Sequence, residues 1–274
     1  MASTHSAATV PRPRHFYTEP EWLDVRDVHV AYRRKGAGEP TLYLHGAGFT
    51  RQWLPHLEAL SQRVDLIAPE HPGYGETEMP EWLDGFDDLV IHYDELLDVL
   101  GLAQVHLVGY SLGGWMAAEF ASFYPRRLKS LTLMVPAGLR ILGKPIPNPV
   151  AMMPDAFFEL IFNDPANMHQ VLPDFEDFDE IVHAYGEGAT LARLAWTTQY
   201  NLKLERRLER VSCPSLVLRA EHDRLICDDM AETYAEVLPS SRIETIPGTG
   251  HALAVEQPEA VATAIGDFID EVAR

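Results

Sequence analysis

The sequence predicts an α/β fold, with a mostly parallel central sheet flanked by helices and an inserted α-helical cap. Short apolar runs alternate along the chain with stretches of helical periodicity, a pattern typical of a parallel sheet covered on both faces. This alternation stops between about residues 137 and 205, where no strand is predicted. A chain of 274 residues, 46% of them hydrophobic, is long enough to build one large domain around a substantial core.

Seven short segments are predicted as strands. Residues 27–34 alternate apolar and polar side chains, as expected for an edge strand. The other six are short apolar runs: 41–44, 64–68, 105–108, 131–135, 215–218 and 242–246. Helical periodicity lies between them, at 89–100, 112–124, 228–238 and 258–273. Prolines at 125 and 239 stand where two of these helices should end.

The predicted domain organisation has four parts. Residues 1–24 are expected to be a flexible lead-in, 25–136 the first part of the core, 137–205 the cap and 206–274 the second part of the core. The cap segment has no lysine or arginine from 145 to 192, but nine acidic residues from Asp155 to Glu187. Its many apolar side chains need a surface to cover, which favours a lid over an irregular solvated excursion.

The composition excludes several classes of protein. A net charge of −19 opposes binding to nucleic acid or to an anionic membrane. Two cysteines are too few for a disulfide framework or a zinc cluster. No segment reaches the roughly 20 apolar residues of a membrane span, and the first residues lack the apolar region of a secretion signal. We therefore expect a cytoplasmic protein, and no motif specifies its oligomeric state.

The run Gly109-Tyr110-Ser111-Leu112-Gly113 carries the strongest chemical signal. It follows a predicted strand and precedes a predicted helix, the context that a nucleophile elbow requires. The turn forces the serine into a strained backbone conformation, and side chains two residues before and after it would collide with the neighbouring strand and helix. Ser111 is therefore the candidate nucleophile.

A serine nucleophile needs a base, and the base needs an acid that orients it. For this type of elbow the acid and then the histidine follow the serine along the chain. Asp223 comes soon after the strand 215–218, and His251 follows the strand 242–246. Both therefore belong to the carboxyl edge of the sheet, where open α/β sheets place their sites. Glu221, Asp228 and Asp229 compete for the acid's role, but Asp228 is expected to cap the next helix instead.

Five motifs together carry a resemblance to a known family. They are His45-Gly46-Ala47-Gly48, Pro72-Gly73-Tyr74-Gly75, the elbow, Glu221-His222-Asp223-Arg224 and Gly248-Thr249-Gly250-His251. In these motifs the chain resembles the α/β-hydrolase fold superfamily, over about residues 25–273, as a serine hydrolase with an inserted lid. Asp223 matches the family position of the acid. A serine at the elbow argues against the haloalkane dehalogenases and epoxide hydrolases of this fold, which use an aspartate.

The resemblance also implies an oxyanion hole. Its two backbone N–H donors would come from Leu112, directly after the nucleophile, and from Ala47, with Gly48 as the alternative. Candidate substrate-binding residues are Gly46, Gly48, Tyr110, Phe157, Phe158 and Trp196. Tyr110 and Trp115 are expected mainly to pack, and Glu119 to lie on the surface. The histidines show no metal-ligand spacing, so neither a metal nor another cofactor is expected.

These residues predict a serine hydrolase of small to medium, largely apolar carboxylic esters, acting through an acyl-enzyme on Ser111. The partner would be a small-molecule ester. Two alternatives stay open. One is a hydrolase of carbon–carbon bonds in ring-fission-type diketo acids, whose carboxylate Arg193 would bind in the cap. The other is a receptor for small molecules that keeps the hydrolase fold, because fold alone does not set function.

Overall fold

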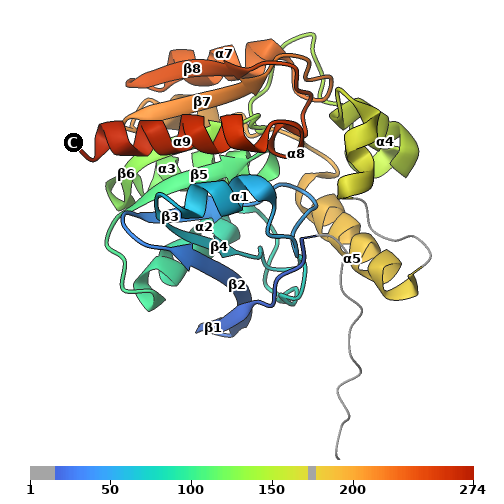
Figure 1. Cartoon of the computed structure of the whole chain (residues 1–274), viewed down its shortest axis with the longest axis horizontal. Helices are drawn as coiled ribbons and strands as arrows, with labels where there is room; N and C mark the ends of the chain where they lie inside the picture. Colours follow the sequence, from blue (N-terminus) through green and yellow to red (C-terminus); the bar gives the residue numbers. More distant parts are fainter. Residues whose placement is uncertain (1–15, 172–176) are drawn as a thin grey trace, which may run out of the picture.

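A computed structural model describes residues 16–171 and 177–274 and has one eight-stranded sheet at its centre (Figure 1). The strand order across the sheet is β1-β2-β4-β3-β5-β6-β7-β8. The strands are β1 (Glu21–Val25), β2 (Val28–Gly36), β3 (Pro40–Leu44), β4 (Asp65–Pro69), β5 (Val105–Tyr110), β6 (Leu128–Met134), β7 (Ser215–Ala220) and β8 (Ser241–Ile246). The β1–β2 and β2–β4 pairs are antiparallel, and the others are parallel. The predicted mostly parallel α/β fold is confirmed.

Helices cover both faces of this sheet. They are α1 (Pro55–Ser61), α2 (Phe86–Val99), α3 (Leu112–Phe123), α4 (Pro154–Ile161), α5 (Phe178–Ala195), α6 (Leu204–Leu208), α7 (Asp228–Val237), α8 (Leu253–Glu256) and α9 (Pro258–Val272). Helix α1 packs against α9 on one face, and α2 packs against α3 on the other (Figure 1). Successive strand residues alternate between the two cores, since Leu42 and Leu44 belong to one and Tyr43 to the other.

The predicted edge strand at 27–34 is wrong in its position. It corresponds to β2, which pairs with both β1 and β4 and so lies one place inside the edge. The edge belongs to β1, whose mostly exposed sequence Glu-Trp-Leu-Asp-Val has no clear alternation for a pattern to detect. Strand β1 also begins at Glu21, within the segment expected to be a flexible lead-in, and residues 1–15 of that segment lie outside the described residues.

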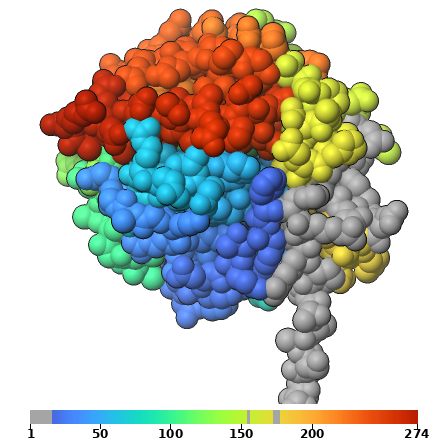
Figure 2. All heavy atoms as spheres, viewed as in Figure 1, coloured from blue at the N-terminus to red at the C-terminus, as the bar shows by residue number. Residues whose placement is uncertain are grey.

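The chain between β6 and β7, which we call the insertion, contains α4, α5 and α6 and, in its described part, no strand. Helices α4 and α5 lie together at one end of the sheet (Figure 1). Figure 2 shows α4 directly against the C-terminal part of the chain, where the Ala252 N–H donates to the Ile161 carbonyl at 2.8 Å. The cap limits at 137 and 205 stay a prediction. None of the described helices is both long and apolar enough to cross a membrane.

Candidate active site

Ser111 stands at a sharp turn between β5 and α3, with φ of 54° and ψ of −109°. Few non-glycine residues adopt a positive φ, so the surrounding structure must hold this conformation. A Cβ atom at Gly109 would come within 2.3 Å of the Gly113 carbonyl oxygen, and one at Gly113 within 2.1 Å of the Leu44 carbonyl oxygen. Helix α3 therefore lies so close to β3 and β5 that only glycine fits on either side of the turn.

The structure brings Ser111, His251 and Asp223 into one hydrogen-bonded chain. His251 Nε2 lies 2.7 Å from Ser111 Oγ, and His251 Nδ1 lies 2.8 Å from Asp223 Oδ2. A carboxylate only accepts, so Nδ1 carries the imidazole proton and Nε2 is left to accept the serine proton. The Leu225 and Ile226 N–H groups donate to Asp223 Oδ1 at 2.9 and 2.8 Å. They hold the carboxylate toward His251, which is itself buried.

A second buried network supports the turn after β3. The Tyr93 hydroxyl hydrogen-bonds His71 Nδ1, and His71 Nε2 lies 2.8 Å from the His45 carbonyl. The backbone N–H of His71 donates to His45 Nε2 at 3.0 Å. This leaves His45 Nδ1 as the donor to the Gly46 carbonyl at 2.7 Å. Burial lowers the pKa of His45 to about 4 and that of His71 well below its usual value, so both rings are neutral. Each nitrogen therefore has one defined role.

This network orients the peptide that follows Gly46. In a trans peptide the carbonyl and the next N–H point to opposite sides, so fixing the Gly46 carbonyl turns the Ala47 N–H away from the His45 ring. Gly46 itself lies against the elbow, where a Cβ atom would be 3.5 Å from Ser111 Cβ. Leu112 is the first residue of α3, so its N–H has no acceptor within the helix. Ala47 and Leu112 both line the cavity next to Ser111.

Ser111 and His251 line a cavity of about 790 Å³ between the end of the sheet and the insertion. Its wall is largely apolar, with side chains from α4, α5 and the loop after β6. Five of the predicted substrate-binding residues line it: Gly46, Gly48, Tyr110, Phe157 and Phe158. Trp196 does not line it. This residue follows the last turn of α5, and 55% of its surface is exposed.

Tyr110 and Trp115 both pack and line the cavity. The Tyr110 hydroxyl donates to the His251 carbonyl at 2.9 Å and so fixes the histidine loop. Trp115 Nε1 donates to Glu119 Oε1 at 3.0 Å. The prediction that Glu119 lies on the surface is therefore wrong: its side chain is buried and also accepts from Asn201 Nδ2 at 2.8 Å. An indole four residues earlier on the same helix face was the signal available in the sequence.

Two further expectations also fail. Asp228 does not cap the next helix, because α7 begins at Asp228 itself and Cys227 holds the cap position. Arg193 does not line the cavity. Its Nη2 donates to the Glu81 carbonyl at 3.2 Å, outside the cavity wall. Over residues 16–171 and 177–274, no three His, Cys, Asp or Glu side chains are grouped so as to hold a metal ion.

Sequence reasoning missed a polar section of the cavity wall. Thr50, Arg51 and Gln52, which follow the turn after β3, line this section together with Glu180, His183 and Glu187 of α5. Burial raises the pKa of Glu187 to about 7, although the Gly75 N–H donates to its Oε1 at 3.1 Å. No feature of the local sequence distinguishes Glu187 from the other acidic residues of the insertion.

Comparison with known proteins agrees with this geometry. A family model described as the alpha/beta hydrolase family matches residues 42–264. The chain belongs to the α/β hydrolase family. The match spans the strands and loops that carry Ser111, Asp223 and His251.

The α/β hydrolases similar to this chain have diverse names. A Bacillus subtilis (strain 168) protein, provisionally named 2-succinyl-6-hydroxy-2,4-cyclohexadiene-1-carboxylate synthase, is 29% identical over 89% of this chain and 94% of its own length. The poly(3-hydroxyalkanoate) depolymerase of Ectopseudomonas oleovorans is 27% identical over 96% and 95%. The structure of a meta-cleavage product hydrolase from Pseudomonas fluorescens IP01 has a TM-score of 0.79 at 19% identity, covering 92% of this chain and 98% of its own. The last match shows the fold alone.

Proposed function

We propose that this α/β hydrolase cleaves small to medium, largely apolar carboxylic esters through an acyl-enzyme on Ser111. The observation that carries the proposal is the hydrogen-bonded chain from Ser111 through His251 to Asp223 at an apolar cavity. A hydroxyl next to a neutral, oriented imidazole is an activated nucleophile. The apolar wall favours an uncharged substrate. This chemistry needs no cofactor.

The mechanism follows from the roles of these atoms. Ser111 Oγ attacks the ester carbonyl carbon while its proton passes to His251 Nε2, and Asp223 stabilises the imidazolium. The negative charge that develops on the carbonyl oxygen is stabilised by the N–H groups of Leu112 and Ala47. His251 then gives its proton to the departing alcohol. Water attacks the acyl-enzyme by the same route, and Ser111 is regenerated.

Two alternative functions differ in what they require of the cavity. A ring-fission diketo acid brings a carboxylate, and Arg193, its expected partner, donates instead to the Glu81 carbonyl. Among the arginines of residues 16–171 and 177–274, Arg51 lines the cavity, so carbon–carbon bond hydrolysis would depend on that residue. A receptor would bind its ligand in the same cavity with little turnover.

Replacing Ser111 by alanine tests the proposal. We expect turnover of p-nitrophenyl esters to fall by at least about 10⁴-fold, because no other group supplies the nucleophile. Ser212→Ala, an exposed serine near the opposite edge of the sheet, is the matched control and should retain full activity. Full activity of Ser111→Ala would contradict the proposed role of the serine. A wild-type protein that turns over a vinylogous 1,5-diketo acid but no ester would move the assignment to carbon–carbon bond hydrolysis.

A further inference from the structure

We propose that the polar section of the cavity wall, built around Gln52 and Glu187, is a subsite for a neutral hydroxyl group of the substrate. This inference rests on the proposed ester hydrolysis and narrows its substrate class to hydroxylated esters. The section comprises Thr50, Arg51 and Gln52 from the loop after β3 with Glu180, His183 and Glu187 from α5. It interrupts a wall that is otherwise mostly apolar.

Gln52 carries the first step of the argument. Its side chain is buried, and Nε2 donates to the Val171 carbonyl at 3.2 Å. A carbonyl can only accept, so this contact fixes the amide with Oε1 facing away from Val171. Oε1 is buried without a hydrogen-bond partner among the residues that the structure describes. Because a buried acceptor is normally paired, the position calls for a donor that is not part of this chain.

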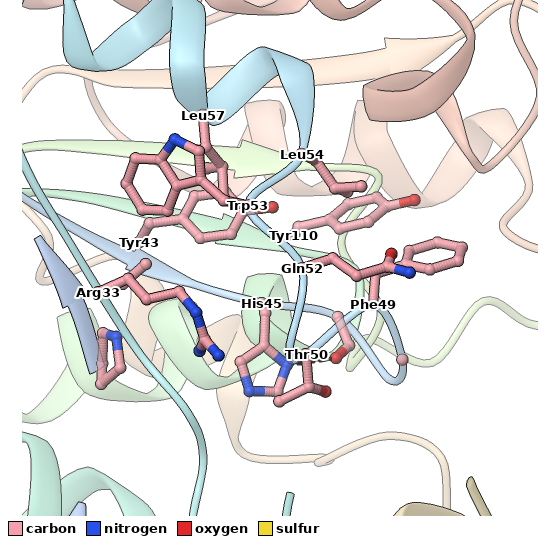
Figure 3. A pocket seen from close by; sticks show the side chains of 14 residues that line it. Arg33, Tyr43, His45, Phe49, Thr50, Gln52, Trp53, Leu54, Leu57 and Tyr110 are labelled. Carbon is pink, nitrogen blue, oxygen red and sulfur yellow. Dashed lines mark hydrogen bonds between the residues drawn. The ribbon is translucent and has the colours of Figure 1, made fainter. Parts of the chain in front are cut away.

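The direction of the side chain favours the substrate cavity over the protein interior. Behind the same loop lies a separate cavity of about 20 Å³, which Arg33 and Trp53 also line. Figure 3 shows Gln52 extending toward Phe49 and Tyr110 and away from Arg33 and Trp53. Phe49 and Tyr110 line both cavities, but Val171, whose carbonyl accepts from Gln52 Nε2, lines the large cavity and not the small one. The Gln52 amide therefore lies at the side of the loop that the substrate reaches.

Glu187 supplies the second step. It lines the same cavity from α5, and its Oε1 accepts from the Gly75 N–H at 3.1 Å. The Thr50 hydroxyl, two residues from Gln52, lies near this carboxyl and lowers its pKa, but burial outweighs that effect and raises it to about 7. A carboxyl that titrates near neutrality can accept a hydrogen bond when ionised and donate one when protonated. The Glu187 carboxyl therefore suits a hydroxyl group, which can also both donate and accept a hydrogen bond.

The charges around the section select a neutral group. A carboxylate on the substrate would lie near Glu180 and Glu187, and an ammonium would lie near the Arg51 guanidinium. Either charge would leave water for a largely apolar cavity, which is unfavourable unless it is fully paired. A hydroxyl avoids both penalties. It can donate to Gln52 Oε1 and exchange a hydrogen bond with Glu187.

Two pairs of esters test the subsite and show which part of the substrate carries the hydroxyl. Glycerol 1-monobutyrate is compared with propyl butyrate, and methyl 3-hydroxybutyrate with methyl butyrate. We expect wild-type kcat/KM to favour the hydroxylated member of one pair by about 10-fold, the effect of one or two hydrogen bonds. Preference in the first pair places the hydroxyl on the alcohol, and preference in the second places it on the acid.

Gln52→Met should reduce that ratio to about 1, because methionine keeps the length of the side chain and removes the amide. Glu187→Leu should lower the ratio independently, which guards against misfolding of either variant. Gln104→Met is the matched control on an exposed glutamine near the opposite sheet edge, and should leave the ratio as in wild type. Equal kcat/KM within both wild-type pairs, or a ratio that survives in Gln52→Met and Glu187→Leu, would overturn the subsite.

The proposed subsite and the proposed ester hydrolysis can be contradicted independently of each other. If wild-type protein cleaves none of the four esters, the proposed function is wrong, and saturation-transfer NMR with the Ser111→Ala protein then tests the subsite alone. Stronger binding of a hydroxylated ester than of its partner, lost in the Ser111→Ala/Gln52→Met double variant, supports the subsite without any catalysis. Equal binding within both pairs overturns it.

Discussion

The two walls of the cavity are held in place by different means. At the sheet end, the backbone of α3 approaches β3 and β5 so closely that Gly109 and Gly113 admit no side chain. On the opposite wall, α5 is joined to the core by side-chain contacts: Thr190 Oγ1 donates to the Gly73 carbonyl at 2.7 Å, and Glu187 accepts from the Gly75 N–H. Much of the remaining surface of α5 is exposed, including Phe178 and Tyr185.

For the proposed function, this difference assigns the reacting groups to the wall held by backbone packing and the substrate contacts to the α5 wall. Backbone packing allows the elbow one arrangement. This suits catalytic atoms, whose positions must be held to within a fraction of an ångström. Side-chain hydrogen bonds can be exchanged or titrated without refolding the sheet. Under the proposed function, we therefore expect substitutions in the α5 wall to change which esters are cleaved while the elbow keeps its geometry.

Two glycine-to-alanine substitutions test the difference between the two walls, and we expect them to give the largest difference in unfolding free energy. In Gly113→Ala the new Cβ would lie 2.1 Å from the Leu44 carbonyl oxygen, so α3 must shift, and we expect a loss of about 3 kcal/mol in unfolding free energy and of most activity. Gly188→Ala, within α5, meets nothing within 4 Å and should gain about 0.5–1 kcal/mol. Urea denaturation of both proteins measures the difference. Equal destabilisation would show that α5 packs as tightly as α3.

The elbow illustrates how much of this site could be predicted from the sequence. A strand, two glycines and a helix within one short run specify a geometry, because few other residues tolerate those close approaches. The topology of a parallel sheet, whose strand ends meet at one edge, predicted that Asp223 and His251 lie together, and the resemblance to the hydrolase family selected Asp223 among the neighbouring acids. The structure places both side chains within hydrogen-bond distance of their expected neighbours.

The α5 wall could not be predicted in the same way. Its residues reach the cavity through the path of the insertion, which no local periodicity determines. Trp196 and Phe158 are both aromatic residues of the insertion, yet only Phe158 lines the cavity. Glu187 stands among nine acidic residues, and its sequence does not distinguish it from solvated neighbours. Such positions depend on tertiary contacts that a single sequence does not reveal.

A pH series on Glu187→Gln should give the next largest effect. Burial raises the pKa of Glu187 from its usual 4.5 to about 7, so folding favours the protonated form. The contribution of Glu187 to the unfolding free energy therefore falls as pH rises from about 4.5 to 7, by about 3 kcal/mol. Glutamine stays neutral and can still accept from the Gly75 N–H. We expect the variant to match wild type at pH 4.5 and to have an unfolding free energy about 3 kcal/mol higher than wild type at pH 8, measured by urea denaturation.

Charged groups around Glu187 also affect its pKa, and a second glutamate provides a control for the pH series. Arg51 lowers the pKa of Glu187 and Glu70 raises it, and Glu180 and His183 share the same wall. Glu58 is the control with the opposite sign, because hydrogen bonds from Lys35 and Trp53 lower its pKa. Glu58→Gln should lose a little stability above pH 4.5 and gain none. A stability difference between Glu187→Gln and wild type that is the same at pH 4.5 and pH 8 would show that Glu187 does not titrate in this range.

Phe158→Ala tests the apolar side of the cavity. Phe158 lines the cavity from α4, with its ring centroid 5.9 Å from that of Phe157. Removing the ring takes away apolar surface that an acyl chain would cover, so we expect kcat/KM for p-nitrophenyl octanoate to fall by about 10-fold. The acetate ester should change much less, because its acyl group is too short to reach far along the wall. An equal loss on both esters would indicate damage to the elbow instead.

Trp196→Ala should have the smallest effect, although it removes a larger side chain. Trp196 is 55% exposed and lies outside the cavity wall, so its loss creates no internal void and removes no substrate contact. We expect kcat/KM to stay within about two-fold of wild type for both esters and the unfolding free energy to change by less than about 0.5 kcal/mol. If kcat/KM for octanoate fell as far as in Phe158→Ala, the end of α5 would have to close over the substrate during turnover. The exposed face of α5 would then be a moving part of the site. The difference between the two cavity walls, one held by backbone packing and the other by side-chain contacts, would hold only for the unliganded protein.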